Sequence, residues 1–282
     1  YVDLSTLKSV EVLKGPASSL YGSDALGGLV SYQSLYPEDL LGAEETFKIE
    51  LPVKYDGSSN QTSGTTRIAV RDDDSGIEGV VVTTISYGEE DNVKADDMYI
   101  DDSEISKKNI YTNIVKNIDD YTRFNLIYEN VDTKRNTIQA KARLSSLYSS
   151  VEEDVDVNRW MGQLGYEYEN EDSGKLFEYA KVNLYVQDAE WNDDAKVEYP
   201  GGFSRGSYSA PKSVVNDYRY DDESKGLNIQ FRSDSTSSGV NHEFTYGMDY
   251  STTFNTRPRK KTTTQSGTTS IENIKDTADA DT

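Results

Sequence analysis

The sequence predicts an all-β protein: an antiparallel transmembrane β-barrel fragment of about nine strands, preceded by the last part of a small α+β domain. Three observations predict it. Apolar and polar residues alternate with a period of two along most of the chain, as in strands with one wet and one apolar face. Several of these stretches reach the roughly 9 to 11 residues with which a tilted strand crosses a bilayer. The links between them alternate between short and long, which is typical of outer-membrane barrels.

The first region, residues 1–42, differs in composition from the rest of the chain. It is rich in Gly and Leu and carries little net charge. Residues 10–13 (VEVL) are expected to form a strand. A turn follows at Gly15 and Pro16, since glycine permits tight reversals and proline fixes φ where a short helix can begin. A second apolar run follows Gly27 and Gly28. We therefore expect a domain boundary near residue 42, with residues 43–282 forming the barrel part.

In the second region, strands are expected where apolar and polar residues alternate, so that apolar side chains share one face and polar side chains the other. In residues 176–190, for example, Val182 and Leu184 share the apolar face, while Lys181, Asn183 and Gln187 share the polar one. The same split recurs in residues 218–232, where Asn228 and Gln230 are polar. These polar faces are predicted to line a lumen, and the apolar faces to meet lipid. The nine expected strands are 46–55, 64–71, 77–87, 109–116, 122–131, 155–168, 176–190, 218–232 and 240–255.

The links between these strands are expected to lie at two different ends of the barrel. Residues 72–76, 117–121, 169–175 and 233–239 are short and turn-like, whereas 88–108, 132–154, 191–217 and the chain from 256 onward are longer, and 55–63 is the shortest of this second set. Tight turns on the periplasmic side and extended loops outside would produce this alternation. A soluble or surface-attached acidic β protein used for adhesion remains the alternative of another class.

The composition narrows the function classes. The chain of 282 residues has 29 Lys plus Arg against 50 Asp plus Glu, a net charge of −21, which excludes a nucleic-acid binder because phosphate contacts need a basic face. Zero Cys and a single His, His242, exclude thiolate and multi-histidine metal sites. Among 50 acidic residues some pairs of carboxylates will be close by chance, so such pairs do not indicate catalysis. We assign no catalytic residue, metal site or resident cofactor, and we do not expect an enzyme.

A pattern in residues 10–30, VEVLKGPASSLYGSDALGGLV, is the most specific in the chain. It contains a strand, a basic residue, Gly-Pro, a short Ser/Ala stretch, Leu-Tyr-Gly and a Gly-Gly pair. This pattern resembles the closing segment of the plug domain of TonB-dependent outer-membrane receptors. The signature residues, to which we assign a structural role, are Lys14, Gly15, Pro16, Leu20, Tyr21, Gly22, Ala25, Gly27 and Gly28.

The resemblance implies a plugged barrel of about 22 strands, of which this chain would hold the end of the plug and roughly the first nine strands. It also implies a place in the bacterial outer membrane, contact with its lipid, and active transport driven by a TonB-type energy-transducing complex. The expected cargo is heme or iron, taken from a host or environmental carrier protein. A ferric siderophore or another ligand is the alternative cargo.

A narrower resemblance is to the hemoglobin, transferrin and heme branch of that family. It is carried by Asp39, Leu40 and Leu41, by residues 113–125, and by residues 242–249 (HEFTYGMD) followed by Arg257 and Pro258. The resemblance implies heme-binding histidines in the plug and in an outer loop, and both expected positions fall outside this sequence. Ligand-contacting residues are therefore not assigned.

Other residues that could bind a ligand also have plain structural interpretations. His242 shares the parity of the apolar face and is expected near the periplasmic rim rather than on a ligand. The tyrosines are expected mainly in the aromatic girdles. The basic run Arg257, Arg259, Lys260 and Lys261 is expected to be a solvated loop, although it could attract an anion. The acidic clusters at 72–74, 96–97, 101–102 and 152–156 could supply oxygen ligands for calcium, but they lack the spacing of an EF-hand and are expected to be solvated loops.

Overall fold

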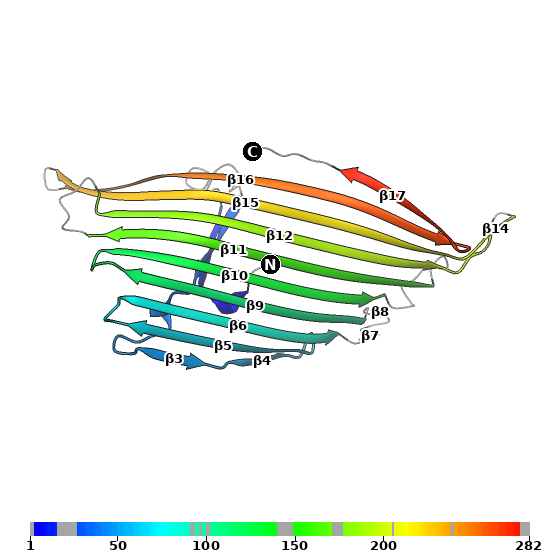
Figure 1. Ribbon diagram of the computed structural model, residues 1–282, viewed down its shortest axis with the longest axis horizontal. Helices are drawn as coiled ribbons and strands as arrows, with labels where there is room; N and C mark the ends of the chain where they lie inside the picture. Colours follow the sequence, from blue (N-terminus) through cyan, green and yellow to red (C-terminus); the bar gives the residue numbers. More distant parts are fainter. Residues whose placement is uncertain are drawn as a thin grey trace.

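A single antiparallel sheet of eleven strands dominates the computed structural model, which describes residues 3–15, 27–90, 94–95, 98–99, 102–139, 149–170, 177–204, 206–237 and 240–276 (Figure 1). Consecutive strands pair side by side in the order β17-β16-β15-β12-β11-β10-β9-β6-β5-β3, and β4 also pairs with β5. The strands are β3 (Phe47–Glu50), β4 (Val53–Asp56), β5 (Gln61–Asp72), β6 (Ile77–Glu90), β9 (Asp102–Asn117), β10 (Thr122–Ile138), β11 (Ser150–Glu169), β12 (Tyr179–Tyr199), β15 (Lys212–Ser237), β16 (Val240–Gln265) and β17 (Thr268–Asp276).

Strands β3 and β4 occupy one position at the edge of the sheet, interrupted around Pro52. Proline has no N–H to donate to a ladder, and it is tolerated at an edge for that reason. Its carbonyl oxygen still accepts a hydrogen bond from the Thr65 amide at 2.9 Å. All nine predicted strands are therefore present, with β3 and β4 together forming the first. The prediction missed a tenth position, β17.

The strands are longer than predicted, and much of the sequence expected as long loops is β-structure. β15 and β16 have 26 residues each, and β12 has 21. Ser266 and Gly267 alone connect β16 to β17, so the link expected from residue 256 onward is a two-residue turn and the predicted alternation ends there. A strand with water on both faces needs no apolar alternation, which explains why the sequence pattern did not reveal these extensions.

The two ends of the sheet differ as predicted for most links. The β5–β6, β9–β10, β11–β12 and β15–β16 connections lie together at one end (left in Figure 1), which we call the turn end. The opposite, loop end carries two small hairpins, β7 (Lys94–Ala95) with β8 (Met98–Tyr99) and β13 (Gly202–Ser204) with β14 (Ser207–Ser209).

The N-terminal segment packs against one face of the sheet. It contains two 3-10 turns, η1 (Leu4–Thr6) and η2 (Pro37–Asp39), and a separate hairpin of β1 (Leu7–Lys14) and β2 (Gly28–Ser34). Both strands were predicted, on either side of the glycines. Among the described ranges, no helical segment has the length and apolar character that crossing a membrane would require.

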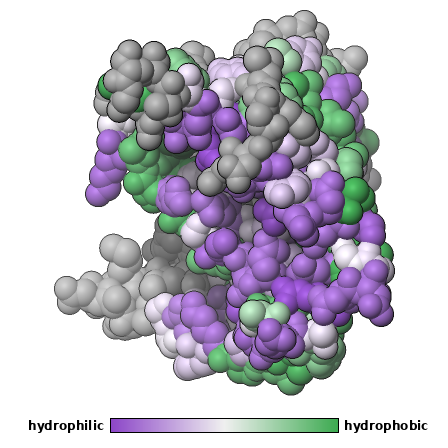
Figure 2. Space-filling view, turned by 90° about the vertical axis from the view of Figure 1, so that its left-hand side faces the viewer, coloured by the Kyte–Doolittle hydropathy of each residue, from purple (hydrophilic) through white to green (hydrophobic). Residues whose placement is uncertain are grey.

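The other face of the sheet is apolar and exposed. Large side chains on it include Leu126, Leu164, Leu184 and Tyr250, which are 49–63% exposed. Figure 2, seen from the turn end, shows hydrophobic residues along the right-hand margin, where this outer face lies, and hydrophilic residues through the middle. Apolar surface of this extent in contact with water would be costly, so this face calls for an apolar covering.

Candidate functional site

The inner face of the sheet is the candidate site, because it holds the polar rows and the docked N-terminal segment. Cross-strand register pairs Asn183 with Asn228 and Lys181 with Gln230. Glu167, which pairs with Lys181, forms an ion pair with Arg123, and Arg123 also contacts Glu38 of the docked segment. The five residues predicted to line a lumen, Lys181, Asn183, Gln187, Asn228 and Gln230, therefore all lie on the inner face.

A first anchor joins η1 to the inner face. The Asp3 carboxylate lies 3.2 Å from Nζ of Lys107, and the Ser5 hydroxyl lies 2.8 Å from that of Thr84. Burial alone would raise the pKa of Asp3, but hydrogen bonds from Ser5 and the charge of Lys107 outweigh it and lower the pKa from its usual value.

The same anchor includes an ion pair within the wall. The Thr6 hydroxyl donates a hydrogen bond of 3.1 Å to Glu129, which also pairs with Arg159 of β11. Arg67 donates to the Ser5 carbonyl oxygen at 3.1 Å. Because the Glu129 carboxylate is buried, a change that removes one of its partners leaves a costly unpaired group.

A second anchor joins residues 35–41 to the wall. The Tyr111 hydroxyl donates to the Leu35 carbonyl oxygen at 2.6 Å, and the Asn113 amide donates to the same oxygen at 3.1 Å. Lys48 donates to the Leu40 carbonyl oxygen at 2.8 Å. A charged contact between Arg123 and Glu38 at 2.9 Å completes the anchor. Within the docked segment, Lys8 of β1 contacts Asp39 at 2.7 Å.

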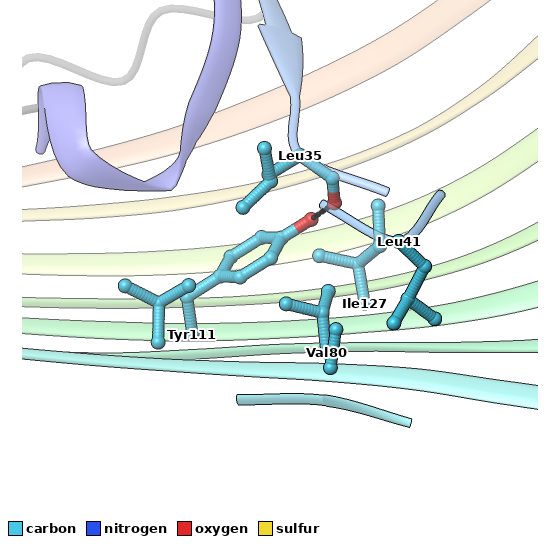
Figure 3. Close-up of a cluster of buried hydrophobic side chains, with 7 residues drawn as sticks. Leu35, Leu41, Val80, Tyr111 and Ile127 are labelled. Carbon is cyan, nitrogen blue, oxygen red and sulfur yellow. Dashed lines mark hydrogen bonds between the residues drawn. The ribbon is translucent and has the colours of Figure 1, made fainter. Parts of the chain in front are cut away.

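An apolar island lies beneath this second anchor (Figure 3). Leu35 and Leu41 pack against Val80 and Ile127, which are almost fully buried. The lumen wall is therefore not uniformly polar, as the alternation had suggested. Because the docked segment covers this part of the wall, side chains there can be apolar without facing water. The cluster is completed by Ala69, Val82 and Tyr111.

The predicted glycine signature lies partly on the β1–β2 hairpin. Lys14 pairs with Gly28, and the Gly15 amide donates to the Gly27 carbonyl oxygen at 3.4 Å. Gly28 has φ of +147°, and a Cβ there would lie 2.6 Å from the Leu13 carbonyl oxygen, so this position requires glycine. Pro16, Leu20, Tyr21, Gly22 and Ala25 lie outside the described residues.

His242 has the position that its parity predicted. It lies on the outer face near the turn end, where it pairs with Ser235 and stacks on Phe244 at a ring distance of 6.1 Å. In the acidic cluster at 152–156, Glu152, Asp154 and Asp156 lie on the outer face of β11 and Glu153 lies on the inner face. No group of three metal-ligating side chains exists in the part of the chain that the structure describes. Residues 96, 97 and 101 of the other clusters lie outside that part.

The tyrosines do not all belong to the outer girdles. Tyr128, Tyr246 and Tyr250 lie on the outer face as expected. Tyr185, Tyr218 and Tyr220, in contrast, share the inner face with Asn183 and Asn228, because they have the same parity on β12 and β15. The residues Arg257 and Arg259, expected in a solvated loop, lie within β16 beside two of these rings.

Residues 1–29 match the family model described as the TonB-dependent receptor plug domain. Heme/hemopexin utilization protein C of Haemophilus influenzae is 37% identical over 60 residues, which cover 21% of this chain and 8% of that protein. The hemin receptor of Yersinia enterocolitica is 46% identical over 41 residues, covering 14% and 6%. Transferrin-binding protein A of Haemophilus influenzae is 34% identical over 83 residues, covering 29% and 9%.

A solved structure matches almost the whole chain. The FrpB iron transporter from Neisseria meningitidis superposes with a TM-score of 0.52 at 13% identity, and the match covers 97% of this chain and 50% of that one. At this identity the likeness concerns the fold. This chain spans about half the length of that structure, and its matches to the curated relatives cover less than a tenth of each.

Proposed function

Because this chain belongs to the TonB-dependent receptors, which are transport receptors of the bacterial outer membrane and not enzymes, we propose that it acts in the active uptake of heme or iron across that membrane. The energy would come from a TonB-type complex in the inner membrane. The cargo would be captured at the loop end and released at the turn end.

One observation carries this proposal: a docked segment occupies the polar inner face of a sheet whose outer face is apolar. Residues 3–6 and 35–41 are held by separate anchors on β6, β9 and β10. Uptake then requires mechanical work on the plug, since breaking these buried contacts costs free energy. The polar inner faces of β12, β15 and β16 are the part of the wall along which a hydrophilic cargo would move.

Heme is the proposed cargo because two of the matching curated proteins carry heme or hemin in their names. A ferric siderophore is the alternative within the same function. A carrier protein that delivers the heme or iron, and outer-membrane lipid around the apolar face, are further proposed partners.

We also propose that residues 1–42 are the last part of the plug and residues 43–282 the beginning of the barrel. The signature residues would maintain the backbone conformation of the hairpin and of the connection between its strands. They are Lys14, Gly15, Pro16, Leu20, Tyr21, Gly22, Gly27 and Gly28. The close backbone approach at Gly28 supports this structural role.

Growth on a defined iron source tests the function. We expect a strain that lacks the receptor gene to lose growth on hemin as sole iron source, and a strain that lacks TonB to show the same loss. The purified receptor should shift the Soret band of hemin. If the strain that lacks the receptor gene loses growth only on a ferric siderophore, the cargo is a ferric siderophore and not heme. Unchanged growth of this strain on every iron source would refute the transport proposal.

A matched pair of variants tests the docked plug. Lys107→Met removes the ion-pair partner of Asp3, whereas Lys108→Met changes the next residue, which is exposed on the other face of β9. We expect only the first variant to make cells more sensitive to a large antibiotic that the outer membrane normally excludes. Equal sensitivity of both variants would argue against a plug held at this anchor.

A further inference from the structure

The wall beneath η1 is lined by hydroxyl and amide groups, with Asn109 of β9 at their centre. Asn109 lies opposite Thr84 of β6, and Lys107 precedes it by two residues on the same face. Both of these neighbours contact η1 or its N-cap Asp3. Thr133 of β10 lies opposite Lys107. Asn109 and Thr133 are each 5% exposed, so η1 covers a buried polar surface, in contrast to the apolar island beneath residues 35–41.

Several polar atoms of this surface have no protein partner. The Nδ2 and Oδ1 atoms of Asn109 are both buried without a hydrogen bond to any described residue, and the hydroxyl of Thr133 is in the same state. Turning the Asn109 amide over would not provide a partner, because both of its ends are unpaired. On the flanking strands β5 and β11, the Nε atoms of Arg67 and Arg159 are also buried and unpaired within the described ranges.

Water is the partner that fits these atoms. Burying an amide or a hydroxyl without a hydrogen bond is costly, and folded proteins rarely do so. A buried water typically makes about three hydrogen bonds to such groups. Asn109 offers both donors and an acceptor, and the Thr133 hydroxyl can donate or accept. The two side chains together therefore provide the partners that a buried water needs.

The hydroxyl groups beside Asn109 can exchange one partner for another. The Thr84 hydroxyl lies 2.8 Å from that of Ser5 in η1 and 3.1 Å from that of Thr65 on β5. In the next row, Ser86 donates to Ser63 at 2.9 Å. A hydroxyl donates once and accepts twice, and its proton rotates to suit the partner. These groups can therefore bond to η1 or to water without a change in the backbone.

We infer that Asn109 and Thr133 bind ordered water between η1 and the wall, with Arg67 and Arg159 as donors at its margins. This water satisfies the wall groups that η1 leaves unpaired. When η1 separates from the wall, water already at the interface takes over its hydrogen bonds, so η1 can leave and return without leaving a buried group unpaired. Residues 35–41 have no such replacement, because they cover apolar side chains. The inference goes beyond the proposed function, since it concerns the docked segment whatever the cargo.

Labelling with hydroxyl radicals from X-ray pulses tests the inference, because radicals formed from a trapped water oxidise the side chains beside it where bulk solvent has no access. The purified receptor in detergent, without cargo or TonB, offers two matched reporters on the inner face of β10. Val131 is 1% exposed and lies opposite Asn109, whereas Ile127 is 2% exposed and belongs to the apolar island. We expect Val131 to be oxidised several-fold faster than Ile127.

Two variants of similar side-chain size remove the groups that bind the water. Asn109→Leu and Thr133→Val should each lower the oxidation of Val131 toward that of Ile127, whereas Lys108→Met, exposed on the other face of β9, should leave it unchanged. The comparison of the two reporters in the wild type stands even where a variant fails to fold. Similar oxidation of Val131 and Ile127 in the wild type, or unchanged oxidation of Val131 in a folded Asn109→Leu or Thr133→Val variant, overturns the inference. Neither result depends on transport, so failure here leaves the proposed function untouched.

Discussion

The Tyr111 hydroxyl donates a 2.6 Å hydrogen bond to the carbonyl oxygen of Leu35, and this bond joins the wall to the segment that it encloses. Both groups are buried, and the apolar island surrounds them. The backbone between β2 and η2 is thereby fixed at a point where it belongs to no strand.

We expect Tyr111→Phe to destabilise the docking of this segment by about 1 kcal/mol, because Asn113 still donates to the same oxygen. Adding Asn113→Ala would leave a buried carbonyl oxygen without a donor and cost about 1–3 kcal/mol more. The rate of tryptic cleavage after Lys14 in the folded receptor would report the opening. Tyr128→Phe, on the outer face, should leave this rate unchanged, and an equal rate in the double variant would contradict the prediction.

The ionisation of Asp3 should make the docking of residues 3–6 on the sheet depend on pH. Its pKa is lowered from the usual value of 3.8, so the folded state prefers the ionised form. The stabilisation is therefore complete above the usual value and is lost as pH falls through the lower folded value. Amide hydrogen exchange of residues 4–6, corrected for intrinsic rates, should rise only in that acidic range. Asp3→Asn should exchange faster at neutral pH, and a rise in the wild type already near pH 6 would be inconsistent with this anchor.

The glycine pair at the end of the hairpin provides a matched test. Gly28→Ala places a Cβ 2.6 Å from the Leu13 carbonyl oxygen at φ of +147°, a strain of about 1–3 kcal/mol. At Gly27 nothing lies within 4 Å of the corresponding position. Amide exchange in β1 and β2 should accelerate in the first variant and remain near the wild-type rate in Gly27→Ala. Similar exchange in both variants would argue against a close approach at Gly28.

Much of the fold could be predicted from the sequence, because lipid on one side and a polar lumen on the other impose a period of two. That period predicted the positions and the two faces of β5, β6, β9, β10, β11, β12, β15 and β16. It also predicted the face on which His242 lies. It failed where both faces are wet. β17 and the outer parts of β15 and β16 have no apolar face, so their sequence reads as loop.

The cross-strand relationships could not be predicted from the sequence, since they depend on register. Nothing in a single strand indicates that Arg257 lies over Tyr220, or that Arg159 reaches Glu129. The apolar island had a signal in residues 79–85, whose inner-facing valines break the polar pattern of the lumen, but its meaning depends on the segment that covers it. An alternating strand shows which side chains share a face and not which neighbours they contact.

The island beneath Leu35 and Leu41 limits where water can enter the pore. Val80, Val82 and Ile127 would have to be wetted if the covering segment left them, at a cost of about 25 cal/mol for each Å² exposed. The wall formed by β12, β15 and β16 carries amides, charged side chains and tyrosines with polar hydroxyl groups instead, and wetting it costs less. A hydrated passage is thus cheapest to open on that side of the lumen, so that solute would pass beside the anchored segment and not through the space it occupies.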